Sequence, residues 1–279
     1  HMDALLASLP PIEHPNDITD DFSHIKLEDR GFNWHEARML FYPQSHTFLV
    51  VCACLYIPVL FLSRSVMKNV KNPPALKGPL IIWNFVATAF SAVGAYYTLP
   101  VLITALQTKS LNDAICDISC YIQSEARWVF YFNASKLFEW IDTFFLVARN
   151  KPIIFLHWFH HITTFLYCWH SSIYSYRADC SGWWFATMNL VVHAIMYFYY
   201  FLAACGIRQS WGSLLTFLQT AQMVVGTAVT LYSMQLCSLS WTRNWHGVLF
   251  CLGMYLVYFY LFSQLLLGRL FPKRKVHTK

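Results

Sequence analysis

Residues 155–166 read FLHWFHHITTFL, and they place His157, His160 and His161 inside an otherwise apolar run. Ionisable side chains at membrane depth are costly unless they line a cavity or find partners, so such a cluster indicates a functional site. An imidazole can act as a base, a nucleophile or a metal ligand near neutral pH. The rest of the chain narrows these roles.

The composition is that of a membrane protein. Of the 279 residues, 57% are hydrophobic and 12% are charged, far from the balance of a water-soluble globule. The nine cysteines form no Cys-x-x-Cys pair, which argues against a structural zinc site, and we expect no bound metal. The net charge of +6 lies mostly in short loops and at the C-terminal end, so we expect no nucleic-acid partner.

Seven windows are long and apolar enough to cross a bilayer, which takes about 20 residues as a helix. The second window is long enough to tilt, or to break near Pro100. The sequence therefore predicts an all-α membrane protein with seven transmembrane helices. The windows are 46–63, 79–105, 128–147, 153–173, 185–204, 214–235 and 246–268.

Basic residues alternate between the two sides of these spans. The odd-numbered loops and the C-terminal end carry most of them, whereas the even-numbered loops hold acidic residues such as Asp113 and Asp117. By the positive-inside rule the C-terminus is cytosolic, and the N-terminus lies on the opposite side, as an odd number of spans requires. We predict a polar non-cytosolic segment over 1–45, a seven-helix catalytic domain over 46–268 and a basic cytosolic tail over 269–279.

Several cysteines fall on the non-cytosolic side, where an oxidising lumen permits disulfides. Cys116 and Cys237 lie in the second and sixth loops and form one candidate pair. Cys120 and Cys180 are competing partners, and free thiols are the other alternative. Placement alone leaves this choice open.

Polar residues recur in four of the spans at one depth. Within each set the members are mostly three or four residues apart, which puts them on one face of a helix. Chain direction reverses at each step, yet at a rise of about 1.5 Å per residue all four sets fall in the cytosolic half of the membrane. The sequence therefore predicts one shared pocket. Its members are Lys136, Glu139, Asp142 and Thr143; His157, His160 and His161; Asn189, His193, Tyr197 and Tyr200; and Thr216, Gln219 and Gln222.

Each set also has a purely structural explanation. Glu139 and Asp142 can neutralise Lys136 in an ion-pair network, and the glutamines can pack between membrane helices. The tyrosines fit an interfacial aromatic belt. A structural protein has little reason to bury four imidazoles together, however, so the four sets jointly favour a catalytic pocket.

These sets resemble the motifs of the ELO family of very-long-chain fatty acid elongases. Lys136–Thr143 is similar to the family's KxxExxDT box, and His157–His161 is similar to its HxxHH box. His193–Tyr200 resembles the HxxMYxYY box, and Thr216–Gln222 resembles the TxxQxxQ box. All four occur in the family's order. The sequence around the histidines, together with Gly182–Phe185, is most similar to the branch of the family that acts on saturated and monounsaturated acyl chains.

The resemblance implies a condensing enzyme of the endoplasmic-reticulum membrane. It would join a long-chain acyl-CoA to malonyl-CoA, releasing CO2 and CoA and leaving a 3-oxoacyl-CoA two carbons longer, as the first step of the elongation cycle. The family's fold has seven helices, six of them in an inverted barrel around a narrow acyl tunnel. The acyl tail would lie in the tunnel and CoA at its basic cytosolic mouth. No further cofactor is implied. Membrane lipid is an expected partner, and association with a second copy or with other elongation-cycle enzymes is left open.

The resemblance also implies roles for individual residues. His160 is the expected acyl acceptor through an acyl-histidine intermediate, and His193 and Asn189 would hold the thioester carbonyl or enolate oxygen. His157 and His161 would orient the site or relay protons. The expected substrate-binding residues are Lys136, Arg149, Tyr199 and Arg269 at the CoA phosphates, Gln219 and Gln222 along the cavity, and Glu139 and Asp142 of the first box.

Alternative assignments remain open. Cys168 is a second candidate nucleophile, but at helical rise it lies about 10 Å deeper than His161. Membrane desaturases and hydroxylases use several HxxHH boxes to bind two irons, whereas this chain has one such box plus His193. A seven-span receptor or transporter would use the buried charges as a proton relay, although no internal repeat is evident.

Overall fold

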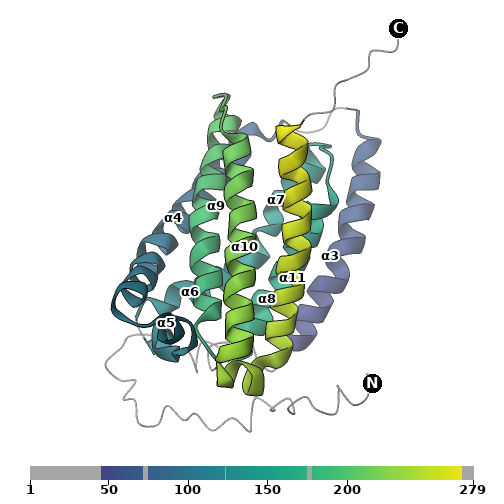
Figure 1. The fold of residues 1–279 in the computed structure, drawn as a ribbon. Helices are drawn as coiled ribbons and strands as arrows, with labels where there is room; N and C mark the ends of the chain where they lie inside the picture. Colours follow the sequence, from purple (N-terminus) through teal and green to yellow (C-terminus); the bar gives the residue numbers. More distant parts are fainter. Residues whose placement is uncertain (1–44, 72–74, 123, 175–177, 272–279) are drawn as a thin grey trace.

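The computed structural model describes residues 45–71, 75–122, 124–174 and 178–271, and within them every regular element is helical (Figure 1). The predicted segment over 1–45 and most of the tail over 269–279 lie outside the described residues. The elements are α3 (Ser45–Lys68), α4 (Lys77–Thr108), α5 (Leu111–Cys116), the 3-10 helix η2 (Ile118–Ile122), α6 (Ala126–Phe138), α7 (Trp140–Ala148), α8 (Phe155–Tyr174), α9 (Ser181–Cys205), α10 (Gly212–Leu236) and α11 (Ser238–Leu270).

Five of these helices are long and apolar enough to cross a membrane: α3, α4, α9, α10 and α11. The chain is therefore a multi-pass membrane protein, and its predicted all-α class is confirmed over the described residues. The two remaining predicted windows, 128–147 and 153–173, correspond to α6 followed by α7 and to α8. These are the windows that carry the first two polar boxes.

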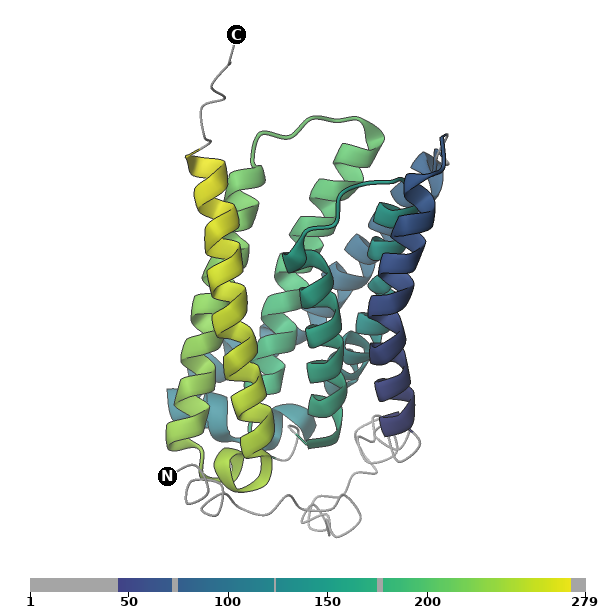
Figure 2. The ribbon, with the colours of Figure 1, turned by 90° about the vertical axis from the view of Figure 1, so that its right-hand side faces the viewer.

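The helices pack in a closed ring. Contacts run from α4 to α9, α10, α11, α8 and α6, and from α6 back to α4. Helix α3 stands outside this ring at one edge, where it contacts α7 and α8 (Figures 1 and 2). The main apolar core fills the ring with large buried side chains such as Phe132, Tyr167, Trp183 and Tyr255.

Helix α4 runs unbroken through Pro100, so of the two alternatives given for this span, a tilt or a break, the break is wrong. A proline is tolerated inside a membrane helix when neighbouring groups compensate for its missing N–H. The ring-facing side of α4 carries small residues, and a Cβ at Gly94 would lie 2.9 Å from the side chain of Leu190 on α9. The interruptions occur elsewhere: Glu139 alone separates α6 from α7, and Asn244 has non-helical dihedral angles inside α11.

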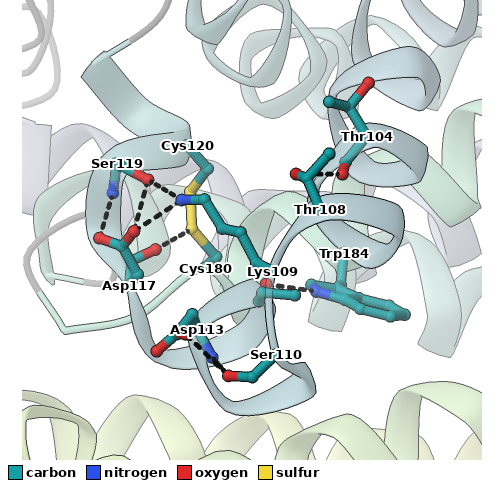
Figure 3. Close-up of polar contacts among 11 residues, drawn as sticks. Thr104, Thr108, Lys109, Ser110, Asp113, Asp117, Ser119, Cys120, Cys180 and Trp184 are labelled. Atoms are coloured by element: carbon teal, nitrogen blue, oxygen red, sulfur yellow. Dashed lines mark hydrogen bonds and ion pairs between the residues drawn. A yellow bond between two sulfur atoms is a disulfide. The ribbon is translucent and has the colours of Figure 1, made fainter.

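Two disulfides lie at one end of the bundle, which we call the disulfide end. Cys116, the last residue of α5, is bonded to Cys237 between α10 and α11. The competing partners pair with each other instead, because Cys120 in η2 is bonded to Cys180 just before α9 (Figure 3). The loops of this end are therefore tied to one another by covalent bonds.

An ion pair reinforces the same end (Figure 3). The Lys109 ammonium lies 2.7 Å from a carboxylate oxygen of Asp117 and donates to the Ser119 hydroxyl at 2.8 Å. Partial burial alone would raise the pKa of Asp117, but the hydrogen bonds from Lys109 and Ser119 outweigh it and lower the pKa. The carboxylate is thus stabilised in its charged form.

This lowered pKa makes a small part of the stability dependent on pH. The contribution is complete above the unfolded-state pKa of about 3.9 and is lost as the pH falls through the lower folded-state value. Both side chains are more than a third exposed, so Asp117→Asn is expected to lower the melting temperature at pH 7 by only about 1–3 °C. Thermal melting in detergent between neutral pH and about pH 3 measures the difference from wild type. A difference that stays constant with pH would contradict the assignment.

Candidate active site

A cavity of about 900 Å³ lies inside the ring of helices. Its walls come from α4, α7, α8, α9, α10 and α11, and all four predicted polar sets contribute to it. At one end the lining residues stand at helix termini: Lys77 begins α4, Arg149 follows α7 and Arg269 is near the end of α11. The cavity therefore opens away from the disulfide end, at the end of the bundle where α11 ends at Leu270 (Figure 1).

Cations and a phenol surround this mouth. Arg149, Tyr199 and Arg269 line it, as the sequence predicted, and the structure adds Lys77. Arg269 donates from Nη1 to the carbonyl oxygen of Gly212 at 2.6 Å. A Cβ at Gly212 would lie 2.9 Å from Nη1 of Arg269 and 3.1 Å from the Tyr199 hydroxyl, so the missing side chain lets both groups close over the start of α10.

Lys136 does not lie at the mouth, and that part of its prediction is wrong. Its side chain is only 2% exposed and does not line the cavity. The ammonium donates to a Glu139 carboxylate oxygen at 2.6 Å and to the amide oxygen of Asn189 at 2.9 Å, and it sits 4.0 Å from the Phe132 ring centroid. A buried ammonium needs such partners. Glu139 likewise lies behind the cavity wall. A substrate-binding residue would have to contact the cavity, and Glu139 does not.

This buried ion pair touches the two candidate groups of α9. Because the amide oxygen of Asn189 accepts from Lys136, its Nδ2–H groups are the donors that Asn189 has for the cavity. The Glu139 carboxylate lies 3.6 Å from Nδ1 of His193. A nearby carboxylate favours a proton on Nδ1, which leaves Nε2 of a neutral His193 as an acceptor. Asn189 is therefore positioned to donate hydrogen bonds, and His193 is positioned to accept one.

The three histidines of α8 occupy one wall, as their spacing predicted. The His157 and His161 rings lie 4.4 Å apart between centroids, and Nε2 of His157 is 3.0 Å from the Thr143 hydroxyl. The His160 ring is 6.5 Å from the His193 ring across the cavity. His160 and His193 thus face one chamber from two helices.

Tyr258 on α11 supports the histidine wall. Its ring centroid is 5.0 Å from that of His160. Its hydroxyl is 2.6 Å from the Thr163 hydroxyl and 2.9 Å from that of Thr164, one turn beyond the histidines. These contacts fix α11 against α8. Sequence reasoning missed Tyr258, because α11 also carries Tyr255 and Tyr260, and the sequence does not show which of these tyrosines reaches the histidine wall.

Asp142 joins three helices at the side of the cavity. One carboxylate oxygen accepts from Nε1 of Trp83 on α4, and the other accepts from the Tyr197 hydroxyl on α9, both at 2.6 Å. Asp142 itself lines the cavity from α7. It was predicted as a substrate-binding residue together with Lys136 and Glu139, but its hydrogen-bond partners are these two aromatic residues.

The inner part of the cavity is less polar. Gln219 and Gln222 line it from α10, and Gln219 also contacts the Met196 sulfur at 3.4 Å. Met223 and Phe262 belong to the lining as well. Beyond them, toward the disulfide end, the ring is filled by the buried aromatic core.

Two further side chains of α8, Cys168 and His170, lie outside the cavity lining. Cys168 is fully buried in the apolar core. His170 lies nearer the disulfide end, where its Nε2 is 2.7 Å from Nδ1 of His246 on α11. Among the histidine side chains that the structure describes, the imidazoles therefore fall into two separate groups, and the group of four at His157, His160, His161 and His193 is the one that lines the cavity.

Comparison with known proteins identifies the same family that the polar motifs lining this cavity resemble. The family model described as ELO: GNS1/SUR4 family matches residues 41–277. The chain is 39% identical over 257 residues to "Very long chain fatty acid elongase 4" of Trypanosoma cruzi (strain CL Brener), covering 88% of each chain. It is 35% identical over 264 residues to "Very long chain fatty acid elongase 6" of Gallus gallus, covering 89% of this chain and 95% of that protein. A protein of the same name from Drosophila melanogaster is 34% identical over 257 residues, covering 88% and 79%.

Proposed function

The chain belongs to the ELO family, and from that premise we propose that it is a fatty acid elongase that condenses a long-chain acyl-CoA with malonyl-CoA. The products are a 3-oxoacyl-CoA two carbons longer, CO2 and CoA. One observation carries the proposal: His160, His193 and Asn189 line a single chamber whose mouth is ringed by cations. The resemblance of the histidine box points to saturated and monounsaturated substrates.

In this proposal the protein spans the endoplasmic-reticulum membrane seven times. The spans are α3, α4, α6 with α7, α8, α9, α10 and α11, and the ring of six around the cavity is the inverted barrel. The disulfide end faces the lumen, where oxidising conditions permit its two bonds. The mouth and the C-terminus then face the cytosol, in agreement with the distribution of basic residues and with a cytosolic supply of CoA substrates.

The mouth provides the binding groups for CoA. Lys77, Arg149 and Arg269 supply charge-assisted donors for its phosphates. A second hollow of about 300 Å³ adjoins the cavity along Tyr199 and continues to Gln209. We assign the pantetheine arm to the main cavity and the nucleotide to this outer region.

The first half of the reaction uses His160 as the nucleophile. Its ring nitrogen attacks the thioester carbonyl, the carbon–sulfur bond breaks, and CoA leaves as a thiolate that takes up the proton lost by the imidazole. The product is an acyl-imidazole on the enzyme. His157 and His161, on the same wall, keep the ring in place. The acyl tail lies along the inner cavity beside Gln219, Gln222 and Met223.

The second half consumes malonyl-CoA. Loss of CO2 leaves the electron pair of the broken carbon–carbon bond as an enolate. The enolate carbon attacks the acyl group, and the bond to His160 breaks. The Nδ2–H groups of Asn189 are placed to stabilise the enolate oxygen, as in an oxyanion hole. His193, whose neutral ring presents an acceptor nitrogen, accepts hydrogen bonds from the bound substrate. The His160 imidazole leaves with the electron pair of the broken carbon–nitrogen bond and takes up one proton from solvent, the proton that the condensation consumes.

The activity can be tested directly with purified protein. We expect palmitoyl-CoA and labelled malonyl-CoA to give a labelled 3-oxoacyl-CoA two carbons longer, with release of CO2. Absence of product across a series of saturated and monounsaturated acyl-CoAs would overturn the proposal. Stoichiometric iron together with a desaturated or hydroxylated product would instead establish the diiron alternative.

The mouth residues give a sharper kinetic prediction. Arg149→Gln and Arg269→Gln are each expected to raise KM for both CoA substrates by about tenfold, because each removes a charge-assisted hydrogen bond to phosphate. Steady-state kinetics of both variants measure the effect. Lys109→Gln, which removes a cation at the disulfide end, is the matched control and leaves KM unchanged. Unchanged KM in both arginine variants would exclude the mouth as the CoA site.

A further inference from the structure

Helix α3 lies outside the ring, yet one of its side chains reaches the histidine wall. The Tyr56 hydroxyl is 3.0 Å from the Thr143 hydroxyl on α7. The same Thr143 oxygen is 3.0 Å from Nε2 of His157. Tyr56 is 7% exposed and its ring packs 4.4 Å from that of Trp140, so the phenol is held in place. A chain of two hydrogen bonds therefore links α3 to His157.

The direction of this chain follows from counting protons. Thr143 has one hydroxyl proton and cannot donate it to both neighbours. If Tyr56 donates to Thr143, the Thr143 proton needs an acceptor, and Nε2 of His157 is the other partner of this hydroxyl within the described residues; each of the three groups is then satisfied. In the opposite order, Nε2–H of His157 would donate to Thr143 and Thr143 would donate to Tyr56. The Tyr56 proton would then have no acceptor, since Thr143 is the hydrogen-bond partner of this hydroxyl within the described residues. Leaving a buried hydroxyl proton unpaired is unfavourable.

We propose that Tyr56 is a positioning residue that fixes His157 as the tautomer protonated on Nδ1. Nε2 is then occupied as an acceptor from Thr143. The remaining ring nitrogen, Nδ1, carries the proton, so His157 offers the cavity a hydrogen-bond donor rather than a base. The peripheral helix α3 thereby becomes part of the active site. The kinetic consequence rests on the proposed function, whereas the tautomer does not.

The purely structural alternative is that the Tyr56 hydroxyl only attaches α3 to the ring. That role would affect stability and leave the protonation pattern of His157 unchanged. The two roles therefore differ in the tautomer itself and in how the effects of Tyr56 and Thr143 combine.

The first test measures the tautomer without substrate. Protein labelled with nitrogen-15 in its histidines is examined by NMR, and the His157 signals are assigned by their loss in His157→Gln. We expect wild type to show a protonated Nδ1 and an unprotonated Nε2, and Tyr56→Phe to show a mixture of both tautomers. A protonated Nε2 in wild type, or an unchanged pattern in Tyr56→Phe, would overturn the inference. Because no substrate is present, a failed elongation assay leaves this result interpretable.

The second test uses kinetics. Tyr56→Phe and Thr143→Val are each expected to lower kcat by about tenfold, at the lower end of the effect of outer residues that orient a functional histidine, with KM unchanged. The double variant should be no slower than either single variant, because both act through one chain. Thr143→Ser, which keeps the hydroxyl, should restore activity. Phe61→Leu, a substitution elsewhere on α3, is the control. Additive losses in the double variant would contradict a shared path.

Discussion

Replacing His160 by alanine is expected to abolish transfer of a labelled acyl group from acyl-CoA to the protein in the absence of malonyl-CoA. His160 lines the cavity, faces His193 at 6.5 Å between ring centroids and is supported from behind by Tyr258. Without its imidazole, no nucleophile remains at the position where the acyl-enzyme forms, and the rate should fall to background. Labelling with a radioactive acyl-CoA followed by gel separation gives the measurement.

The control for this experiment lies on the same helix. His170→Ala removes an imidazole that is outside the cavity lining, so labelling should remain close to wild type. Thermal melting of both variants establishes that each is folded. Normal acylation of the His160→Ala protein would show that another group is the nucleophile.

Removing the buried ammonium is expected to have the second large effect. Lys136→Met leaves the Glu139 carboxylate buried without its partner at 2.6 Å. Breaking one side of a buried ion pair costs about 3–5 kcal/mol, so the melting temperature should fall markedly. Condensation activity should fall too, because Asn189 loses the group that orients its amide. Melting curves and initial rates of purified protein measure both effects.

A second variant separates stability from catalysis. Lys136→Met combined with Glu139→Gln removes both charges, so most of the stability should return. Activity should stay low, because Asn189 still lacks the Lys136 ammonium and His193 has now lost the Glu139 carboxylate. Recovery of full activity in the double variant would mean that the ion pair serves only to hold the helices together.

The membrane makes much of this fold readable from sequence. Apolar windows must be long enough to cross the bilayer, so they identify the helices. Polar residues within such windows are costly, so they identify the functional site. The shared cavity followed from four polar sets at one depth. The break at Glu139 did not, because a residue with φ −62° and ψ −15° hardly disturbs the helical period.

The residues that the sequence misplaced or missed are those whose positions depend on which way a helix face points. Periodicity put Lys136 on the correct stripe but could not show that the stripe turns toward α9 and away from the mouth. Trp83, Tyr56 and Tyr258 stand among other aromatic residues in apolar helices, and only their folded contacts distinguish them from those neighbours. The cysteines of the even-numbered loops were predicted to share one side of the bundle, and they do, but their pairing depends on distances that topology alone does not give.

The most direct test of the account is to locate the acyl group on the protein. Purified enzyme is incubated with a long-chain acyl-CoA alone, digested under conditions that preserve acyl-imidazoles, and sequenced by mass spectrometry. We expect the added acyl mass to lie on the peptide containing His160 and to be released when malonyl-CoA is added before digestion. An acyl group on Cys168 or on another cysteine, or full condensation activity with no covalent adduct, would contradict it.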